Sequence, residues 1–500
     1  MSSRFGRSPV QAPAASPSSP APSSVTTSHF APASFNELLA AAQAAARQLD
    51  GEGVLSLALP LPARDPLTLL PHLGDGERFR FLWDGAPGLC IAASGRTNSL
   101  ELSGPRRFEL AQRFSAVSLS RLASSQSCPP LARPRVLLAF AFFDSPLQEG
   151  EGVAGVQAVL PRWQLSRQGR HCWLRLQRSL GGEVTARALA EELWEEAQRL
   201  IALPVEPEAL VTAGPGPVII QRSSWQEGYR SVVERGLELV EGGSLRKLVL
   251  AVRQQLLLNR PLDPVRLLAQ LRQRQPGSCR FLWQRGEAPA LLGASPERLL
   301  VVRQGQLRSD ALAGTAPIGA AAAQLTRSEK DRREHEMVVE AISAVLRAEG
   351  LRARRPRHPR LARHGQLVHL HTPITAALGG QAPLTIAAAL HPTPAVAGLP
   401  RRDAMAALRC LEPFERGCYA APIGWVDSEG DTELRVAIRS GRLQGRRLEL
   451  TAGAGLVQGS EPERELQEVA LKLGVLQQQL SLAPQTNGPR TNGPRTTFLD

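Results

Sequence analysis

The stretch RFLWDGAPGLCIAASG, residues 80–95, recurs in altered form as RFLWQRGEAPALLGAS at residues 280–295. Both copies begin with RFLW, contain an Ala-Pro pair and end in a run of small residues. Self-similarity of this kind predicts two structurally related halves. Chance similarity between two short strands is the alternative interpretation.

The sequence around the two copies alternates short apolar strands with amphipathic helices, and many of the strands come as hairpin-like pairs. This pattern favours an α+β fold with antiparallel sheet. We expect a first half over 35–213 and a second half over 225–482. The Pro/Gly-rich segment AGPGPV, 213–218, is the expected junction.

The two ends of the chain differ in composition from the halves. Residues 1–34 are rich in Ser, Pro and Ala, which predicts a disordered tail. This tail has no apolar stretch typical of a secretory signal, but its acid-poor character leaves a plastid-type transit peptide open. Residues 483–500 contain the turn-rich repeat TNGPRTNGPR, which predicts a flexible end.

Bulk composition narrows the class of protein. The 500 residues are 43% hydrophobic, but no run of 18 apolar residues is present, so we expect a soluble cytoplasmic protein without a membrane partner. Six cysteines without C-x-x-C spacing fit reduced thiols. The net charge of +13 could indicate a nucleic-acid partner. Arginine is spread along the chain and aromatics are only 4%, which favours a solvated basic surface and no nucleic acid.

Lysine is rare in this basic chain. Of 59 Lys and Arg residues, only those at positions 247, 330 and 472 are lysine. An amine can lose its proton when it is desolvated, whereas guanidinium does not, so a retained lysine is a candidate for acid-base chemistry. Mutational bias that leaves a few lysines by chance is the alternative, and for Lys330 it is the preferred interpretation.

Several polar side chains interrupt apolar strands of the second half. KLVLAVR, 247–253, reads as a strand with Lys247 and Arg253 on one face, where burial would favour the neutral amine. GASPERLL holds Glu297 after a Ser-Pro pair. A surface lysine and an exposed glutamate are the alternatives. SDALAGTAPIG, 309–319, reads as a small-residue loop, and His369 and His371 are expected on opposite faces of a strand.

Two predicted helices carry carboxylates. Residues 328–347 form the first helix, with Glu334 at the edge of its apolar stripe. The second, 462–480, places Glu465, Glu468 and Lys472 on one face. Together these glutamates make a plausible oxygen-ligand set for magnesium. For either helix alone, a solvated face with a Glu468–Lys472 pair is the competing interpretation.

The order of these motifs resembles the chorismate-utilising enzymes, and within them most closely the isochorismate synthases. The resemblance is continuous from about 225 to 480 and loose in the first half. It rests on nine ordered motifs: KLVLAVR, GASPERLL, LAGTAPIG, SEKDRREHEMVVEAI, LVHLHTPI, LHPTPAVAGLP, FERGCYAAPIGWVD, ELRVAIRSG and AGAGLVQGSEPERELQEVALK. The family fold would have two related halves, large antiparallel β-sheets packed together and helices on the outside.

The resemblance also implies roles for matching residues. Lys247 would activate water for attack at C2 of chorismate, and Glu297 would protonate the departing C4 hydroxyl. Glu334 and Glu468 would bind Mg²⁺, with Glu465 nearby and acting through water. Arg439 would grip a substrate carboxylate. The remaining matches to substrate-contacting positions are Gly314, Thr315, Ala395, Gly453 and Lys472.

Water is the expected nucleophile, because the ammonia-using relatives generally lack a lysine at the position of Lys247. No glutamine amidotransferase subunit is therefore expected, and a monomer or weak dimer would suffice. Val396 and Tyr419 stand where relatives vary, which leaves a salicylate synthase as the nearest alternative. An ammonia-using relative is a further alternative, and so is a basic nucleic-acid-binding protein that kept only the fold.

Overall fold

The computed structural model describes residues 34–49, 53–124, 128–146, 153–181, 184–204 and 216–482. The predicted tails, 1–34 and 483–500, lie outside these ranges except for Ser34. The transit-peptide alternative therefore concerns residues that the structure does not describe.

The larger sheet has 14 strands within the described ranges, and its strand order is symmetric about its centre. The order β11-β22-β21-β13-β12 is followed by β2-β3-β8-β9-β1, so each half supplies five strands in mirrored order. The strands of the first half are β1 (Gly53–Leu61), β2 (Phe79–Asp84), β3 (Cys90–Ser94), β8 (Trp163–Gln168) and β9 (His171–Leu180). Those of the second half are β11 (Lys247–Leu258), β12 (Cys279–Arg285), β13 (Ala290–Ser295), β21 (Ser440–Gln444) and β22 (Arg447–Leu456). Four short strands extend the edges: β5 (Leu122–Ala123), β10 (Val218–Arg222), β18 (Gly398–Leu399) and β23 (Ser481–Leu482).

The two RFLW copies form the seam between the halves. β2 and β12 pair antiparallel with Leu82 directly opposite Leu282, which is the register that a local twofold axis requires. Across the same pair of strands, Asp84 accepts from Arg280 in an ion pair of 2.9 Å that is almost fully buried. The internal repeat therefore marks corresponding strands of two related halves.

In the described part of the chain the smaller sheet has nine strands, and it packs face to face on the larger one. Phe81, Trp83 and Phe281 of the RFLW copies pack in one apolar cluster with Leu137 and Trp425 of the smaller sheet. The Phe and Trp of each copy thus fill the space between the sheets, because alternate residues of a strand share a face. Its strands are β4 (Asn98–Leu102), β6 (Arg135–Phe140), β7 (Val156–Leu160), β14 (Arg298–Arg303), β15 (Gln306–Pro317), β16 (Arg360–His364), β17 (Leu367–Ala377), β19 (Pro422–Asp427) and β20 (Thr432–Val436).

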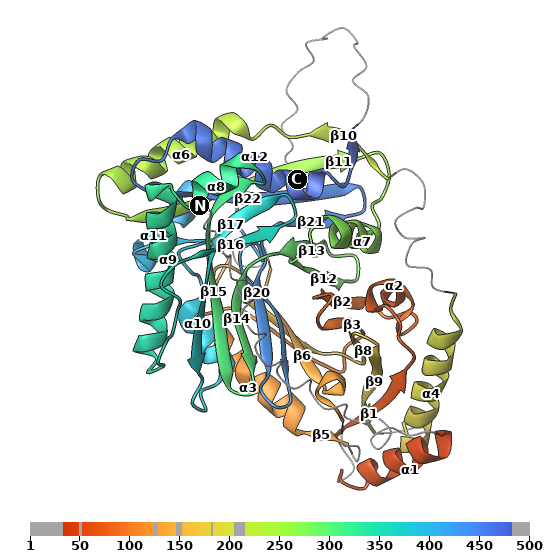
Figure 1. The fold of residues 1–500 in the computed structure, drawn as a ribbon. Coiled ribbons are helices and arrows are strands. Elements are labelled where there is room, and N and C mark those ends of the chain that lie inside the picture. Colours follow the sequence, from red (N-terminus) through yellow and green to blue (C-terminus); the bar gives the residue numbers. More distant parts are fainter. Residues whose placement is uncertain are drawn as a thin grey trace, which may run out of the picture.

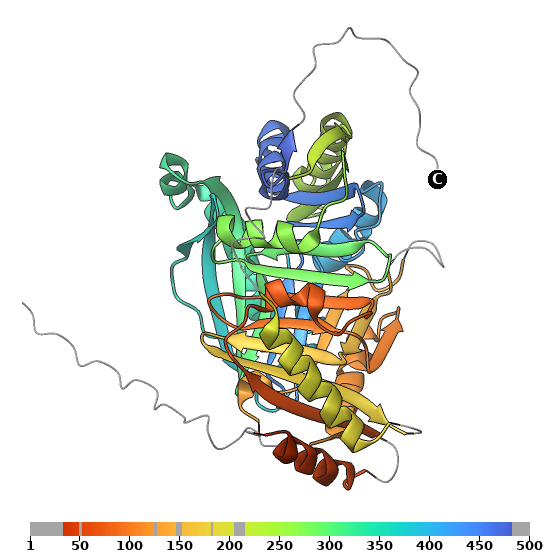
Figure 2. The same cartoon turned by 90° about the vertical axis from the view of Figure 1, so that its right-hand side faces the viewer.

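Helices cover the outside of the sheets, as expected (Figure 1). Figure 2 shows α6 and α12 side by side at the second-half end and α1 and α4 side by side at the opposite end. The helices are α1 (Phe35–Ala46), α2 (Pro66–Leu69), α3 (Arg107–Ser120), α4 (Ala186–Ala202), α6 (Gln226–Glu241), α7 (Pro264–Arg274), α8 (Ala320–Leu325), α9 (Glu329–Ala348), α10 (Pro383–Leu390), α11 (Arg401–Leu411) and α12 (Pro462–Gln477). The predicted α+β class with two related halves is confirmed.

Three local features differ from the sequence-based picture or add to it. The predicted loop 309–319 is mostly strand β15, because its small residues pair with β17 and only a bulge interrupts the pairing between Ala313 and Ala316. β10 lies between the two predicted halves and pairs with β11. Among the described residues, no helix combines the length and the apolar character needed to cross a membrane.

Candidate active site

A cavity lies between the second-half part of the large sheet, the strands β15 and β17, and the helices α9 and α12. The empty space of the cavity, together with open solvent at its mouth, is about 610 Å³. Nine of the eleven predicted site residues line it: Glu297, Gly314, Thr315, Glu334, Ala395, Arg439, Gly453, Glu468 and Lys472. The other two are buried beside lining residues: Lys247 pairs with Glu334, and Glu465 lies one turn before Glu468 on α12.

Lys247 is the first residue of β11 and is fully buried, with 1% of its surface exposed. Its Nζ donates to Oε1 of Glu334 on α9 at 2.9 Å. Val249 and Ala251, on the same face of β11, line the cavity, as the alternation in KLVLAVR predicted. The alternative of a surface lysine is therefore wrong, because the ammonium is buried against a carboxylate at the cavity wall.

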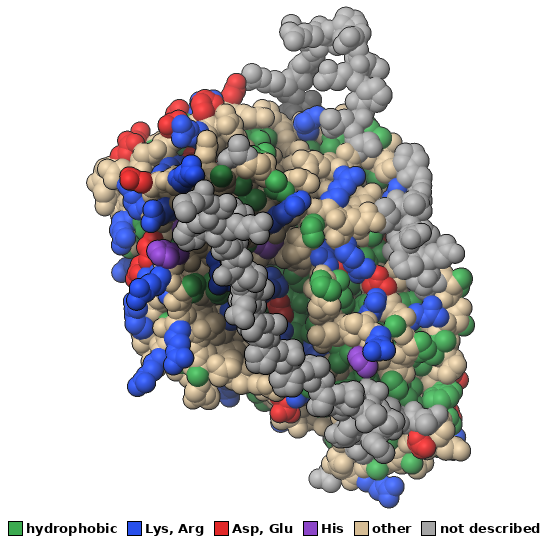
Figure 3. Space-filling view, viewed as in Figure 1, with side chains coloured by type: hydrophobic (Ala, Val, Ile, Leu, Met, Phe, Trp, Pro, Cys, Tyr) green, Lys and Arg blue, Asp and Glu red, His purple; other side chains and the backbone are tan. Residues whose placement is uncertain are grey.

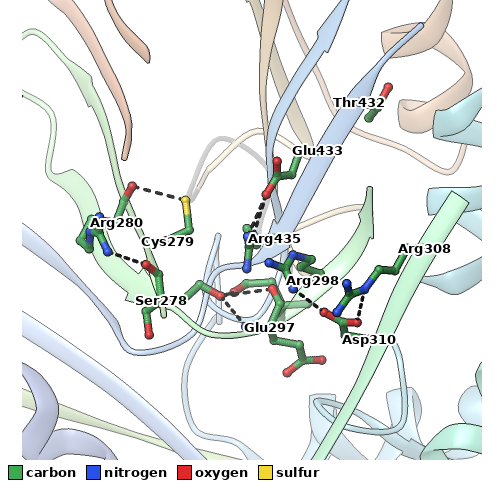
Figure 4. Close-up of polar contacts among 12 residues, drawn as sticks. Ser278, Cys279, Arg280, Glu297, Arg298, Arg308, Asp310, Thr432, Glu433 and Arg435 are labelled. Atoms are coloured by element: carbon green, nitrogen blue, oxygen red, sulfur yellow. Dashed lines mark hydrogen bonds and ion pairs between the residues drawn. The ribbon is translucent and has the colours of Figure 1, made fainter. Parts of the chain in front are cut away.

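Glu297 follows β13 and is 4% exposed, so the alternative of an exposed glutamate is also wrong. Its backbone N–H donates to Oγ of Ser295 at 3.2 Å, which fixes the turn after the strand. Figure 4 shows its carboxyl group pointing away from the ion pair between Arg298 and Asp310. Burial raises the pKa of Glu297 to about 8, although the positive charges of Lys247 and Arg439 act to lower it. The carboxyl group is therefore protonated at neutral pH.

Glu468 on α12 is a third charged residue at the cavity. Its carboxylate accepts from Nζ of Lys472 at 2.5 Å, and the same Nζ donates to the carbonyl of Gly453 at 2.7 Å. Burial alone would raise the pKa of Glu468, but Lys472 and Arg439 outweigh that effect and the pKa is lowered. The predicted i,i+4 pair is present, and it faces the cavity and not bulk solvent.

Glu465, one turn before Glu468, is 2% exposed and accepts from Nζ of Lys330 at 2.9 Å. Burial and repulsion from Glu468 raise the pKa of Glu465. Asp331, in the first turn of α9, lies near the same group. Burial raises the pKa of Asp331, and the charges of Glu334 and Glu468 add to the increase.

These carboxylates fit a hard divalent cation by their chemistry. Oxygen donors from α9 and α12 line one cavity, and magnesium prefers such donors. Throughout the described ranges, no three His, Cys, Asp or Glu side chains stand close enough together to form a ready metal cage. Each of the three glutamates is paired instead with a lysine, and a cation held by Glu334 and Glu468 would replace the ammonium groups of Lys247 and Lys472 there.

Arg439 supplies the positive wall of the cavity. It adopts a left-handed conformation with φ of 51°, which costs a non-glycine residue of the order of 1–3 kcal/mol and is found mainly at functional sites. Burial lowers the pKa of its guanidinium, while Glu297 and Glu468, which line the same cavity, act to raise it. A planar cation of this kind suits a carboxylate of a bound ligand.

His369 is a cavity residue to which the sequence analysis gave no role. The expectation that His369 and His371 point to opposite faces is wrong, because residues two apart in a strand share a face. Nδ1 of His369 lies 2.9 Å from the carbonyl of Gly314, so this nitrogen carries the proton. Nε2 is then an acceptor, and it is buried without a partner among the described residues. Burial keeps the pKa of His369 well below its ordinary range, so the ring is neutral.

Glycine permits the close approach of strands at the base of the site. A Cβ at Gly453 would lie 2.6 Å from the carbonyl oxygen of Leu250 on β11. A Cβ at Gly455 would lie 2.7 Å from Oε1 of Glu334 and 3.1 Å from Cε of Lys247. Any larger residue at position 455 would therefore push apart the Lys247–Glu334 ion pair that joins β11 to α9.

Comparison with known proteins identifies the family. The family model described as chorismate binding enzyme matches residues 39–481. The chain belongs to this family. The resemblance inferred from the nine motifs is thus confirmed, and the match extends into the first half, where the motifs were loose.

Individual chorismate-binding relatives agree. The salicylate biosynthesis isochorismate synthase of Pseudomonas aeruginosa is 33% identical over 454 residues, which are 87% of this chain and 92% of that protein. The isochorismate synthase DhbC of Bacillus subtilis is 40% identical over 49% of this chain and 66% of its own length. The solved structure of MenF, the menaquinone-specific isochorismate synthase from Escherichia coli, matches with a TM-score of 0.71 and 27% identity over 89% of this chain and 100% of that chain.

Proposed function

We propose that the protein is a magnesium-dependent isochorismate synthase that interconverts chorismate and isochorismate. The observation that carries the proposal is the placement of a buried amine and a protonated carboxyl group at one cavity. Glu297 lines the cavity, and Lys247 lies beside the lining residues Glu334 and Gly455. Among the charges that act to lower the pKa of Glu297, that of Lys247 is the strongest. The relatives named above, two of them similar over most of this chain, carry the name isochorismate synthase.

In this proposal, Lys247 removes a proton from water as the oxygen attacks C2 of the ring. Glu297 gives its proton to the hydroxyl that leaves C4, and that hydroxyl departs as water. The double bonds of the ring shift, and no atom is gained or lost overall. The site is reset when the proton gained by Lys247 is returned to Glu297. General acid and base groups of this kind each contribute about 10²- to 10⁴-fold.

The other residues bind and orient the substrate in this proposal. Arg439 holds one carboxylate of chorismate, and the neutral Nε2 of His369 accepts from a substrate hydroxyl. Glu334 and Glu468 would hold Mg²⁺, with Glu465 acting through water. Magnesium, when bound, would withdraw electron density through the ring carboxylate as the double bonds move. Glu334 now accepts from Nζ of Lys247 at 2.9 Å, so a metal held by Glu334 would weaken that pair and favour the neutral amine, which is the form that acts as the base.

The nature of the nucleophile decides what partners are needed. With water as the nucleophile, no glutamine amidotransferase subunit is required, and the product would enter menaquinone or phylloquinone synthesis, or a siderophore or salicylate pathway. We expect the enzyme to work in the cytoplasm as a monomer or weak dimer, without nucleic acid. Figure 3 shows Lys and Arg side chains scattered over the visible face and mixed with acidic ones over α6 and α12. This distribution favours a solvated basic surface.

A product assay tests the proposal. Purified protein is incubated with chorismate and Mg²⁺, and the products are separated by chromatography, with a reaction containing EDTA as the control. Isochorismate that forms only with the metal supports the proposal. Salicylate as the main product would replace it with a salicylate synthase, and anthranilate formed from ammonia would replace it with an ammonia-using enzyme. Salt-sensitive RNA binding without turnover would favour the nucleic-acid alternative.

A further inference from the structure

All three lysines of the chain stand at the same group of carboxylates. Lys247 pairs with Glu334 at 2.9 Å, Lys330 with Glu465 at 2.9 Å, and Lys472 with Glu468 at 2.5 Å. The other basic side chains of the chain, among 59 in total, are arginines. Chance retention does not explain why the lysines meet one carboxylate each. Lys330 therefore needs a reason of its own.

The position of Lys330 on its helix is unfavourable. It is the second residue of α9, whose N-terminus is capped by Ser328 and carries Glu329 and Asp331 in its first turn. The positive end of a helix dipole repels a cation at this place, by about 0.3–1 kcal/mol at the surface. The contact that offsets this cost spans 135 positions of sequence, to Glu465 on α12.

Lysine also differs from arginine in what it can hold. Its ammonium is a compact point charge, whereas guanidinium is a flat fork that binds a carboxylate along one edge. Glu465 is 3% exposed in its side chain and Lys330 is 30% exposed, so the ammonium enters from the solvent side and the carboxylate stays inside. A compact cation occupies less of the carboxylate than a guanidinium fork would. Glu465 also accepts from the side chain of Ser460, and a carboxylate has enough lone pairs to accept from a water molecule as well.

We propose that Lys330 is a positioning residue of the metal site, which holds the carboxylate of Glu465 where it can accept from water on a divalent cation bound by Glu334 and Glu468. The inference rests on the metal dependence in the proposed function. It assigns Lys330 a role through Glu465 and no contact with substrate. The loss of such an outer partner typically costs about 10- to 100-fold in metal affinity.

The test measures metal binding directly, without turnover. Mn²⁺ is titrated into the full-length protein in the absence of chorismate, and the free ion is followed by its electron paramagnetic resonance signal. Competition with Mg²⁺ then gives the affinity of the same site for Mg²⁺. The variants are Lys330→Met, Lys330→Arg, Glu465→Gln and the Lys330→Met/Glu465→Gln pair. Arg333→Met is the matched control, because it removes one exposed positive charge from the same helix.

We expect Lys330→Met and Glu465→Gln each to weaken Mn²⁺ binding about 10- to 100-fold, and the double variant to be no weaker than Glu465→Gln alone. Lys330→Arg should recover part of the loss, and Arg333→Met should bind as the unchanged protein does. Circular dichroism checks folding, and Lys330→Gln takes the place of Lys330→Met if the latter does not fold.

Two outcomes overturn the inference in different ways. One outcome is that the unchanged protein binds Mn²⁺ and Lys330→Met binds it equally well, or that the losses of Mn²⁺ affinity in the two single variants multiply in the double variant. Lys330 then does not act through Glu465, and the proposed function stands. If the unchanged protein binds no divalent cation at millimolar concentration, both the metal dependence in the proposed function and the role of Lys330 are wrong.

Discussion

Replacement of Glu297 by Gln should lower activity and raise stability at the same time. The amide keeps the shape of the side chain but cannot donate a proton as an acid does, so we expect kcat to fall by about 10²- to 10⁴-fold. In the unchanged enzyme, the pKa of about 8 means that the acid is lost as pH rises. The rate should therefore fall about tenfold per pH unit above about pH 8.

The stability effect follows from proton linkage. The folded protein keeps the Glu297 proton up to about pH 8, whereas the unfolded chain releases it near the ordinary value of 4.5. Between these values the folded state binds more protons, so the free energy of unfolding decreases as pH rises and is level above about pH 8. At about 1.36 kcal/mol per unit, the interval gives an upper limit of about 5 kcal/mol. Glutamine does not ionise and escapes this cost.

Thermal and urea unfolding of both proteins from pH 5 to pH 9 measures this difference. Glu297→Gln should gain stability relative to the unchanged protein as pH rises, with most of the gain complete by about pH 8. Glu238→Gln on α6, which changes an exposed side chain away from the cavity, is the control and should show no such trend. A stability difference that does not change with pH would refute the burial of a neutral acid at this position.

Three further changes test the other walls of the cavity. Lys247→Met keeps the volume of the buried aliphatic stem and should lower kcat by about 10²- to 10⁴-fold in steady-state assays. Its circular dichroism spectrum should be unchanged. A rate within tenfold of normal would exclude Lys247 as the base. Glu334→Ala should raise the Mg²⁺ concentration for half-maximal rate at least about tenfold, and an unchanged Mg²⁺ titration would argue against Glu334 as a ligand. Arg439→Gln should raise KM about 10- to 100-fold with a smaller change in kcat. The reason is that a charge-assisted hydrogen bond to the substrate carboxylate is worth about 1.5–3 kcal/mol. A normal KM would mean that the substrate does not bind at Arg439.

Much of the fold could be predicted because its main signal is local. The RFLW copies alternate Phe and Trp with Arg and Leu, and this period-two pattern is set by the strand itself. What could not be predicted is that the copies lie side by side, with Leu82 opposite Leu282, since pairing between distant strands leaves no local mark. The strand β15 was missed for the opposite reason, because Ala and Gly favour loops unless sheet neighbours enclose them.

The site divides in the same way. Lys247 and Glu297 could be singled out because a charged residue in or beside an apolar strand is conspicuous in the sequence. The nine-motif resemblance then gave them roles. Lys330 and His369 could not be assigned, because their meaning comes from partners elsewhere in the chain. Lys330 contacts Glu465 only after α9 packs near α12. The hydrogen bond from Nδ1 of His369 to the carbonyl of Gly314 is what leaves Nε2 as an acceptor, and it too forms only in the folded protein.

The charges around the cavity would favour binding of the proposed metal together with the substrate. Glu297 is neutral at pH 7, and each of the three glutamates on α9 and α12 is matched by a lysine. Asp331 and Arg439 add one charge of each sign, so that the described side chains come near to balance. A divalent cation alone would disturb that balance by two positive charges, and a dicarboxylate alone by two negative ones. Together they restore it, and because charge imbalance is costly where water is excluded, each should bind more tightly in the presence of the other. In this proposal Lys247 and Lys472 are counter-ions of Glu334 and Glu468 in the empty site and are displaced from these carboxylates by the metal, whereas Lys330 remains paired with Glu465.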